Sequence, residues 1–415
     1  MSDTSRELIY DWNTESSEPI PDLAPAQVCD ETLRDGLQSP SVRHPSTDEM
    51  LRLLHRMAAL GIDAVNIGLP GAGPHVVASA TRLAEEIRDR KFPIQANCAA
   101  RTLIRDIEPI HRIMDEVGIE IEVAMFIGSS PIRMEVEHWD VDYLLATCEK
   151  ALDYCAKNGL PVMFVTEDTT RTPPEVVERL YGQAIDMGAK RLVVCDTCGH
   201  ATPAGVRHLI HFVRHVARER GRPDVQLDWH GHQDRGLGVS NSLAAYEAGV
   251  NRLHATALGV GERAGNTPMD QLLVNLRLLG YIPDERDLTG LMDYVRDAAE
   301  YLDVHVPFNY PVVGSDAFET GTGVHAAAVI KALRRGDMDL ANHVYSGVPA
   351  HLFGFEQVIR VGPMSGKSNV VWWLEHNGYE VTDERVEEIF QAAKSSNKVL
   401  TDAELHDLAK AGTPA

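Results

Sequence analysis

Two histidines separated by one residue, His230 and His232, stand at the end of an apolar segment, within the sequence WHGHQDRGLG. In a β-strand, residues i and i+2 project to the same side, so the two imidazoles converge on one point. Neutral imidazole is a common ligand of divalent metal ions. A single histidine at such a place is more often structural, but two at this spacing predict a metal site.

An adjacent Arg34 and Asp35 follow another short apolar run, in the sequence CDETLRDGLQSP. Gly36 permits a sharp turn directly after them. Asp35 is the acid on a second strand that we expect to join the two histidines as a metal ligand, whereas a plain surface ion pair is the ordinary interpretation of such a dipeptide.

Polar residues also follow other apolar runs. Asn266, in the segment GVGERAGN, offers a neutral oxygen that could complete a mixed nitrogen and oxygen shell. Glu167, Thr169 and Thr197 lie in VTEDTTRT and CDTCGHATP, where they could form hydrogen bonds with an oxygen-rich substrate. The alternative for Thr169, as for Thr202, is a helix N-cap.

The elements that must position these residues alternate between short apolar strands and amphipathic helices over residues 27–283. The candidate strands are QVCD, DAVNIG, IQANC, EIEVAMFI, PVMFVTED, RLVVCD, VQLDWHGH and RLHATALG. Eight strand–helix units of this total length predict a (β/α)8 TIM barrel, in which active sites form at the carboxyl ends of the strands. Ser46 and Glu49 are spaced as a capping box for the first long helix.

The segments outside the predicted barrel differ in pattern. Residues 1–26 form a polar N-terminal arm, without the basic and then apolar layout of a signal peptide. Residues 284–415 predict a smaller, mostly helical C-terminal region, with helical stretches such as GVHAAAVIKALRR and DERVEEIFQAAKSS. We therefore expect an α/β barrel followed by a helical subdomain.

The composition of the 415 residues excludes several classes of protein. Lysine and arginine number 39 against 61 aspartates and glutamates, a net charge of −22, which disfavours binding to nucleic acid or to anionic membranes. No apolar run approaches the length of a membrane span. The six cysteines are scattered through apolar segments, which predicts reduced thiols and a cytoplasmic protein. Cys195 and Cys198 form one CxxC, for which we favour a structural role because no second pair exists.

Taken together, the motifs resemble those of the DRE-TIM metallolyase superfamily, and most closely those of the isopropylmalate, homocitrate and citramalate synthases. The segments ETLRDGLQSP, TEDTTRT, DTCGHATP, HGHQDRGLGVSNSLAAYEAG and GVGERAGN occur in the order found in that family. The resemblance extends over nearly the whole chain beyond residue 26. It implies a TIM barrel and a Claisen-type condensation of acetyl-CoA with a 2-oxo acid.

The resemblance also implies roles for particular residues. Asp35, His230 and His232 would be the metal ligands, with Asn266 nearby, and the metal would be a divalent ion such as Mn²⁺, Mg²⁺ or Zn²⁺. The remaining roles fall to residues at other strand ends: Arg34 would polarise the keto oxygen, Thr197 would hold the carboxylate of the 2-oxo acid, and Glu167 would steer the substrate or a water.

The C-terminal region resembles the part of the family that completes the active site. SDAFETGTGVHAAAVIK would carry a catalytic His325, and YSGVPAHLFG would carry a supporting Tyr345. In the family this region reaches the partner subunit's barrel, so a homodimer is implied. A feedback domain of roughly 100 residues, as in leucine-pathway synthases, is not expected after it.

Some positions depart from the isopropylmalate synthase pattern. Asn66 stands where those synthases usually carry Glu, and Ala124 and Met125 stand where they usually carry His and Thr. Together with Gln38 and Arg133, Asn66 is expected to bind substrate. We therefore expect a substrate other than 2-oxoisovalerate, and Arg133 suggests a side chain that bears a carboxylate or a phosphonate.

Three other functions remain open. A lyase of the 3-hydroxy-3-methylglutaryl-CoA type is the first, because RDGLQ is the spelling of that group, although the loop after the eighth strand carries no cysteine here. A pyruvate aldolase or carboxyltransferase barrel, which would need no acetyl-CoA, is the second. A barrel that binds CoA esters without turnover is the third, and the set of polar strand-end residues argues against it.

Overall fold

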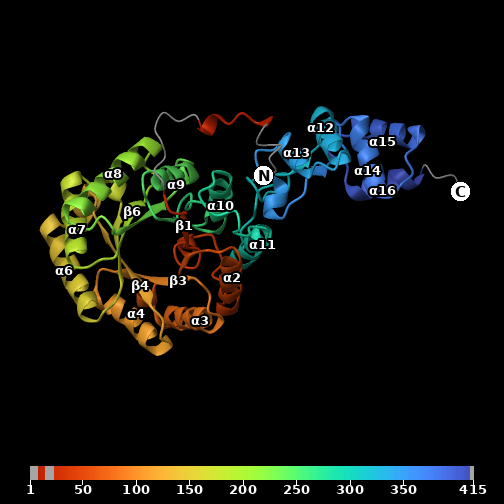
Figure 1. Cartoon of the computed structure of the whole chain (residues 1–415). Coiled ribbons are helices and arrows are strands. Elements are labelled where there is room, and N and C mark those ends of the chain that lie inside the picture. Colours follow the sequence, from red (N-terminus) through yellow and green to blue (C-terminus); the bar gives the residue numbers. More distant parts are fainter. Residues whose placement is uncertain (1–7, 15–22, 412–415) are drawn as a thin grey trace. The chain divides into compact units, whose positions relative to one another are not determined.

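The computed structural model describes residues 8–14 and 23–411, and the chain divides into two compact units. Among the described residues, one unit consists of residues 23–305, and the other of residues 306–411 with residues 8–14. The first unit contains a closed barrel of parallel strands (Figure 1). The predicted TIM barrel with additional C-terminal helices is thereby confirmed.

The barrel strands pair in sequence order, and β8 closes the ring by pairing with β1. They are β1 (Gln27–Asp30), β2 (Ala64–Asn66), β3 (Gln95–Arg101), β4 (Ile121–Gly128), β5 (Val162–Glu167), β6 (Arg191–Asp196), β7 (Gln226–Gly231) and β8 (Arg252–Ala255). All of them coincide with the apolar runs of the sequence. Because every strand is parallel, the eight carboxyl ends open on the same face of the barrel.

Helices form the outer ring of the barrel (Figure 1). They are α2 (Thr47–Ala59), α3 (Pro74–Arg90), α4 (Ile104–Val117), α5 (Pro131–Glu137), α6 (Val141–Lys157), α7 (Pro174–Asp186), α8 (Pro203–Glu219), α9 (Gly238–Glu247), α10 (Met269–Leu278) and α11 (Leu291–Leu302). The capping box of α2 is present, since Ser46 accepts a hydrogen bond from the backbone of Glu49 and Glu49 accepts one from Ser46.

Helix α11 lies in the barrel unit, whereas the sequence pattern placed it in the C-terminal region that begins at residue 284. The physical reason is a buried contact, in which the hydroxyl of Tyr294 donates to the carboxylate of Asp30 at the end of β1. Arg56 on α2 adds two ion pairs to α11, with Asp293 at 3.0 Å and Asp297 at 2.7 Å. The division of the chain therefore falls between residues 305 and 306.

The C-terminal unit is mainly helical, as the sequence predicts. Its helices are α12 (Gly323–Arg334), α13 (Met338–His343), α14 (Lys367–His376), α15 (Asp383–Ser395) and α16 (Asp402–Ala411). One apolar core lies between α14, α15 and α16, around Leu374 and Ile389. A second core joins α12 and α13 around Ile330.

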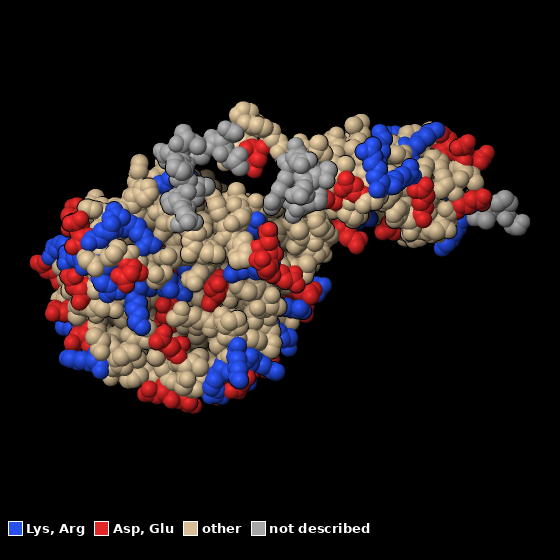
Figure 2. Space-filling model, in the orientation of Figure 1, with Lys and Arg blue, Asp and Glu red and all other residues tan. Residues whose placement is uncertain are grey.

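Charged side chains of both signs are interspersed over the face of the molecule that Figure 2 shows. Exposed charged residues of the outer helices form ion pairs, such as Lys157 with Asp153 at 2.6 Å and Arg179 with Asp142 at 2.8 Å. Within residues 8–14 and 23–411, no helix is both long enough and apolar enough to cross a membrane.

Candidate metal-binding active site

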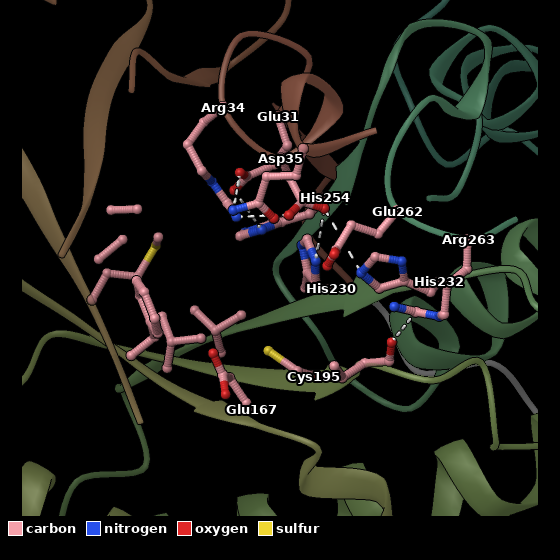
Figure 3. A pocket seen from close by; sticks show the side chains of 18 residues that line it. Glu31, Arg34, Asp35, Glu167, Cys195, His230, His232, His254, Glu262 and Arg263 are labelled. Carbon is pink, nitrogen blue, oxygen red and sulfur yellow. Dashed lines mark hydrogen bonds and ion pairs between the residues drawn. The ribbon is translucent and has the colours of Figure 1, made fainter. Parts of the chain in front are cut away.

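Asp35, His230 and His232 come together at the carboxyl end of the barrel, as the strand pattern predicted (Figure 3). Their candidate ligand atoms all lie within 4.8 Å of one another. Oδ2 of Asp35 is 3.6 Å from Nε2 of His230 and 3.7 Å from Nε2 of His232. Ligands about 2.1 Å from a tetrahedral ion are separated by about 3.4 Å, so this spacing fits a metal centre.

The electrostatics of the three side chains also suit a metal ion. Burial lowers the pKa of His230 to about 3 and lowers that of His232, despite the nearby Asp35 carboxylate, so both imidazoles are neutral at pH 7. Burial alone would raise the pKa of Asp35, but the Arg34 guanidinium beside it outweighs burial and lowers it. Two neutral nitrogens and one carboxylate oxygen form a donor set that Zn²⁺, Mn²⁺ and other divalent ions accept.

Asn266 is fixed directly beside this triad. It forms an isolated bridge with His232, and its Nδ2 donates to Oδ2 of Asp35 at 2.7 Å and to the carbonyl of Val260 at 3.1 Å. Its Oδ1 is buried and has no hydrogen-bond partner among the residues described. The loop comes this close because Gly265 has a φ of +90° and packs against the carbonyl of Gly259, where a Cβ atom would have no room.

Arg34 lies at the edge of the triad. Its guanidinium donates to Oδ1 of Asp35 at 2.8 Å and to the carboxylate of Glu31, while its Nε is buried without a hydrogen-bond partner in the described part of the chain. Burial opposes its charged form, but Glu31 and Asp35 raise its pKa, so Arg34 is a permanent cation in the pocket.

A buried group of charged residues extends from Arg34 into the barrel interior, and sequence reasoning missed it. We call this group, including Arg34 and the triad, the charged wall. Its other members are Glu31, Glu122, Arg191, Asp228, Arg252 and His254. The missed signal was an alternation: Asp228 precedes His230 by two residues on β7, and Arg252 precedes His254 by two on β8, so each pair projects inward.

His254 shows how tightly these groups are paired. Its Nε2 lies 2.9 Å from Oδ2 of Asp228, and its Nδ1 lies 3.1 Å from Oε1 of Glu31. Burial disfavours its charged form, but the hydrogen bonds to Asp228 and Glu31 outweigh burial and raise its pKa. For Glu31 itself, burial would raise the pKa, whereas Arg34 and His254 lower it well below its usual range.

The opposite side of the pocket is apolar, and we call it the apolar wall. It consists of Ala99, Ala124, Phe126, Met163, Val165, Val193 and Cys195, which come from β3, β4, β5 and β6. The pocket between the two walls has a volume of about 130 Å³ (Figure 3). Small side chains at Ala99 and Ala124 leave room for the side chain of a small organic acid.

Three further predicted residues, Gln38, Glu167 and Thr197, line this pocket. Burial raises the pKa of Glu167, although Arg133 and Arg34 partly oppose this. Thr197 accepts a hydrogen bond from the backbone of Asp168 at 2.9 Å through its hydroxyl oxygen. Its hydroxyl hydrogen is therefore available to donate to a ligand.

Two residues that were expected to bind substrate lie elsewhere. Asn66 is fully buried at the end of β2, where its Oδ1 accepts from the backbone of Gly68 at 3.2 Å, and it does not line the pocket. Arg133 lines an adjoining pocket of about 310 Å³ that shares Phe126 and Glu167 with the first. There it forms an ion pair with Glu137 at 3.0 Å.

The remaining predicted residues are His325 and Tyr345 of the C-terminal unit and the two cysteines of the CxxC in the barrel unit. The rings of His325 and Tyr345 stack, with centroids 4.1 Å apart and an interplanar angle of 27°. Cys195 is buried in the apolar wall, and Cys198 accepts a hydrogen bond from Arg171 at 3.2 Å. Burial raises the pKa of both thiols, which is consistent with a structural role for each.

Comparisons with known proteins extend this picture. A model of the family described as HMGL-like matches residues 26–297. Homocitrate synthase AksA of Methanopyrus kandleri is 31% identical over 92% of this chain and 91% of its own length. Homocitrate synthase of Sulfolobus acidocaldarius is 28% identical over 93% of this chain and 79% of its own length. A probable 2-isopropylmalate synthase of Methanopyrus kandleri is 29% identical over 89% of this chain and 69% of its own length.

Solved structures share the barrel. Hydroxymethylglutaryl-CoA lyase of Pseudomonas aeruginosa superposes with a TM-score of 0.56 at 22% identity, over 67% of this chain and 93% of the lyase. The carboxyl transferase domain of Rhizobium etli pyruvate carboxylase superposes with a TM-score of 0.51 at 15% identity, over 68% of this chain and 47% of that chain. At these identities the likeness concerns the fold alone.

Proposed function

Because this chain belongs to the HMGL-like family, we propose that it is a metal-dependent acyltransferase that condenses acetyl-CoA with a 2-oxo acid. The products are a 2-substituted malate and free CoA. The observation that carries the proposal is the juxtaposition of a two-histidine and one-carboxylate cluster with a permanent cation, Arg34, in one pocket. The names of the relatives, homocitrate synthase and 2-isopropylmalate synthase, support the same reaction class.

Asp35, His230 and His232, with Asn266 beside them, would hold the divalent ion, which supplies Lewis acidity toward the 2-oxo acid when it is bound. The chain's own residues then orient the substrate. Arg34 places its positive charge where negative charge develops on the keto oxygen. Thr197 donates its hydroxyl hydrogen to the carboxylate of the 2-oxo acid.

Removing a proton from the methyl group of acetyl-CoA requires a base, because that group is a weak acid. We assign this role to His325, with Tyr345 stacked against it as its support. Glu167, whose pKa burial raises, would steer the substrate or the water that hydrolyses the thioester. The C-terminal unit is proposed to serve the barrel of a second subunit, so that the enzyme is a homodimer.

For the substrate, we propose a 2-oxo acid whose side chain runs along the apolar wall and ends in an anionic group near Arg133. Ala124 and Phe126 offer the apolar path, and Phe126 is shared with the pocket that Arg133 lines. Replacing Arg133 by Ala should lower kcat/KM at least tenfold for 2-oxo acids with a second carboxylate, and leave it unchanged for monocarboxylic ones. A change in kcat/KM relative to the wild type that is the same for both classes would remove Arg133 from the site.

Release of free thiol from acetyl-CoA tests the reaction itself. The purified protein is incubated with Mn²⁺ or Mg²⁺ and a panel of 2-oxo acids, and the thiol is titrated over time. Thiol release that requires both the metal and a 2-oxo acid is expected. Cleavage of a 3-hydroxyacyl-CoA without release of thiol would instead identify a lyase, which was the principal alternative from the sequence.

A further inference from the structure

Glu31 stands at the carboxyl end of β1, three residues before Arg34, and only 1% of it is exposed. Its two carboxylate oxygens hold different cations. Oε2 accepts a hydrogen bond from Arg34, and Oε1 lies 3.1 Å from Nδ1 of His254 (Figure 3). A carboxylate with a binding partner on each oxygen has a fixed orientation, and it therefore also holds the orientation of the guanidinium that it binds.

His254 is anchored in turn to the strand that carries the histidine pair. Its Nε2 lies 2.9 Å from Asp228, which is the residue two positions before His230 on β7. The Oδ2 that contacts His254 also pairs with Arg252 at 2.7 Å, and Oδ1 of Asp228 pairs with Arg191 at 2.7 Å. In the register of the barrel, His254 pairs with His230 on one side and with Cys29 on the other.

Arg34 needs such an anchor because its other partner is Asp35, a proposed metal ligand. A carboxylate that shares its charge with a cation attracts a neighbouring guanidinium less strongly. With its Nε unpartnered within the described residues, the Arg34 guanidinium has Glu31 as its second contact. Glu31 is thus the partner of Arg34 that does not compete with the metal.

We propose that Glu31, held by His254 and Asp228, is a positioning residue that keeps the Arg34 guanidinium aimed at the keto oxygen of the substrate. This inference rests on the proposed condensation reaction and adds a residue that acts on it through Arg34. Glu31 acts through Arg34, by keeping one hydrogen-bonding edge of the guanidinium in place.

The test compares Glu31→Gln with Glu122→Gln, a matched change at the deep end of the same interior. Glu122 pairs with Arg191 at 3.1 Å and with Arg252 at 2.9 Å, and it has no recorded contact with Arg34 in the described chain. For Glu31→Gln we expect kcat to fall about 10- to 100-fold, with KM for the 2-oxo acid changed less than about threefold, since charge develops on the keto oxygen only in the transition state. Glu122→Gln should keep the wild-type kcat.

Charge balance provides a second variant in case the single change prevents folding. The double variant Glu31→Gln/His254→Gln removes one acid and one cation together, and it should fold and show the same loss of kcat. Metal content, measured by mass spectrometry, should stay at the wild-type level in all three variants.

Three results would overturn the inference: a wild-type kcat in Glu31→Gln, an equal loss of kcat in Glu122→Gln, or a rise in KM alone. A wild-type protein that releases no thiol with any 2-oxo acid would instead contradict the proposed function. The two failures are therefore distinguishable.

Discussion

The two walls of the same pocket are built on opposite principles. The charged wall comes mainly from β1, β7 and β8, with Glu122 added from β4 and Arg191 from β6, and its buried acids and bases are paired with one another in the barrel interior. The apolar wall comes from β3 to β6, and it contains small or flexible side chains such as Ala124 and Met163. Layers of branched apolar residues usually fill the interior of a TIM barrel, so it is the charged wall that departs from the common pattern.

The difference follows from what each wall must do. Polar groups inside a protein are stable only when they are paired in good geometry, so the charged wall fixes the directions of Asp35, Arg34 and His230. Apolar contacts have no preferred direction, so the apolar wall sets the size of the pocket and little else. We therefore expect changes at the charged-wall residues that contact Arg34 or the triad to affect the chemical step, and changes deeper in the same wall to affect stability. Changes in the apolar wall should affect substrate choice.

The largest effect should follow removal of a metal ligand. His232→Ala leaves two of the three triad ligands, so the bound metal should be lost and kcat should fall roughly 1000-fold or more, because a Lewis acid contributes several kcal/mol to such a step. Metal content and thiol release measure the two effects. His208→Ala, an exposed histidine on α8, is the control, and a His232 variant that retains metal and activity would contradict the site.

The second effect concerns stability. Arg252→Met leaves Asp228 and Glu122 each without one of its buried partners, which should lower the free energy of unfolding by about 3–5 kcal/mol. Lys157→Met breaks an exposed pair with Asp153 and should cost no more than about 1 kcal/mol. Chemical denaturation compares the two variants, and similar losses in both would show that the charged wall is not a cooperative unit.

The upper layer of the charged wall could be predicted from the sequence, whereas the pairing between residues of the lower layer could not. His230 and His232 were found because the two-residue period of a strand directs both side chains to the same face. The pairs of Glu31 with His254 and of His254 with Asp228 depend on the register between β1, β7 and β8, in which His230 lies beside His254. A single sequence shows periods within a strand, but it does not show the register between strands.

The predicted substrate pocket shows the same limit. Of the two neighbouring residues on β4 that were expected beside the substrate, Ala124 lines the pocket and Met125 does not, because successive side chains of a strand point to opposite faces. Asn66 ends a strand of three residues, too short for alternation to show which face its side chain occupies. Arg133 lies in α5, after the strand has ended, so its direction depends on a turn at Ser129 and Ser130.

A smaller and more selective effect is expected in the apolar wall. Ala124→Leu fills part of the 130 Å³ pocket, so kcat/KM should fall about 10- to 100-fold for 2-oxo acids with long side chains and stay unchanged for glyoxylate, which has none. Ala156→Leu on the exposed side of α6 is the control. Steady-state kinetics on the two substrates measure the change, and an equal loss for glyoxylate would mean that Ala124 acts on the charged wall instead.

The smallest effect is a pH dependence that belongs to the charged wall. The pKa of Glu31 is lowered in the folded protein, despite its burial, by Arg34 and His254, so the unfolded chain binds more protons than the folded one as the pH falls. Its contribution to stability is therefore complete above the ordinary pKa of 4.5 and is lost progressively below it, by up to about 1.4 kcal/mol per pH unit. Glu31→Gln lacks this group. Its free energy of unfolding, although lower at pH 7, should fall less steeply than that of the wild type between pH 5 and pH 3. Thermal unfolding across this range measures both slopes. Parallel curves would mean that the pKa of Glu31 is the same in the folded and the unfolded protein. Arg34 and His254 would then stabilise the Glu31 carboxylate no more than water does at the protein surface.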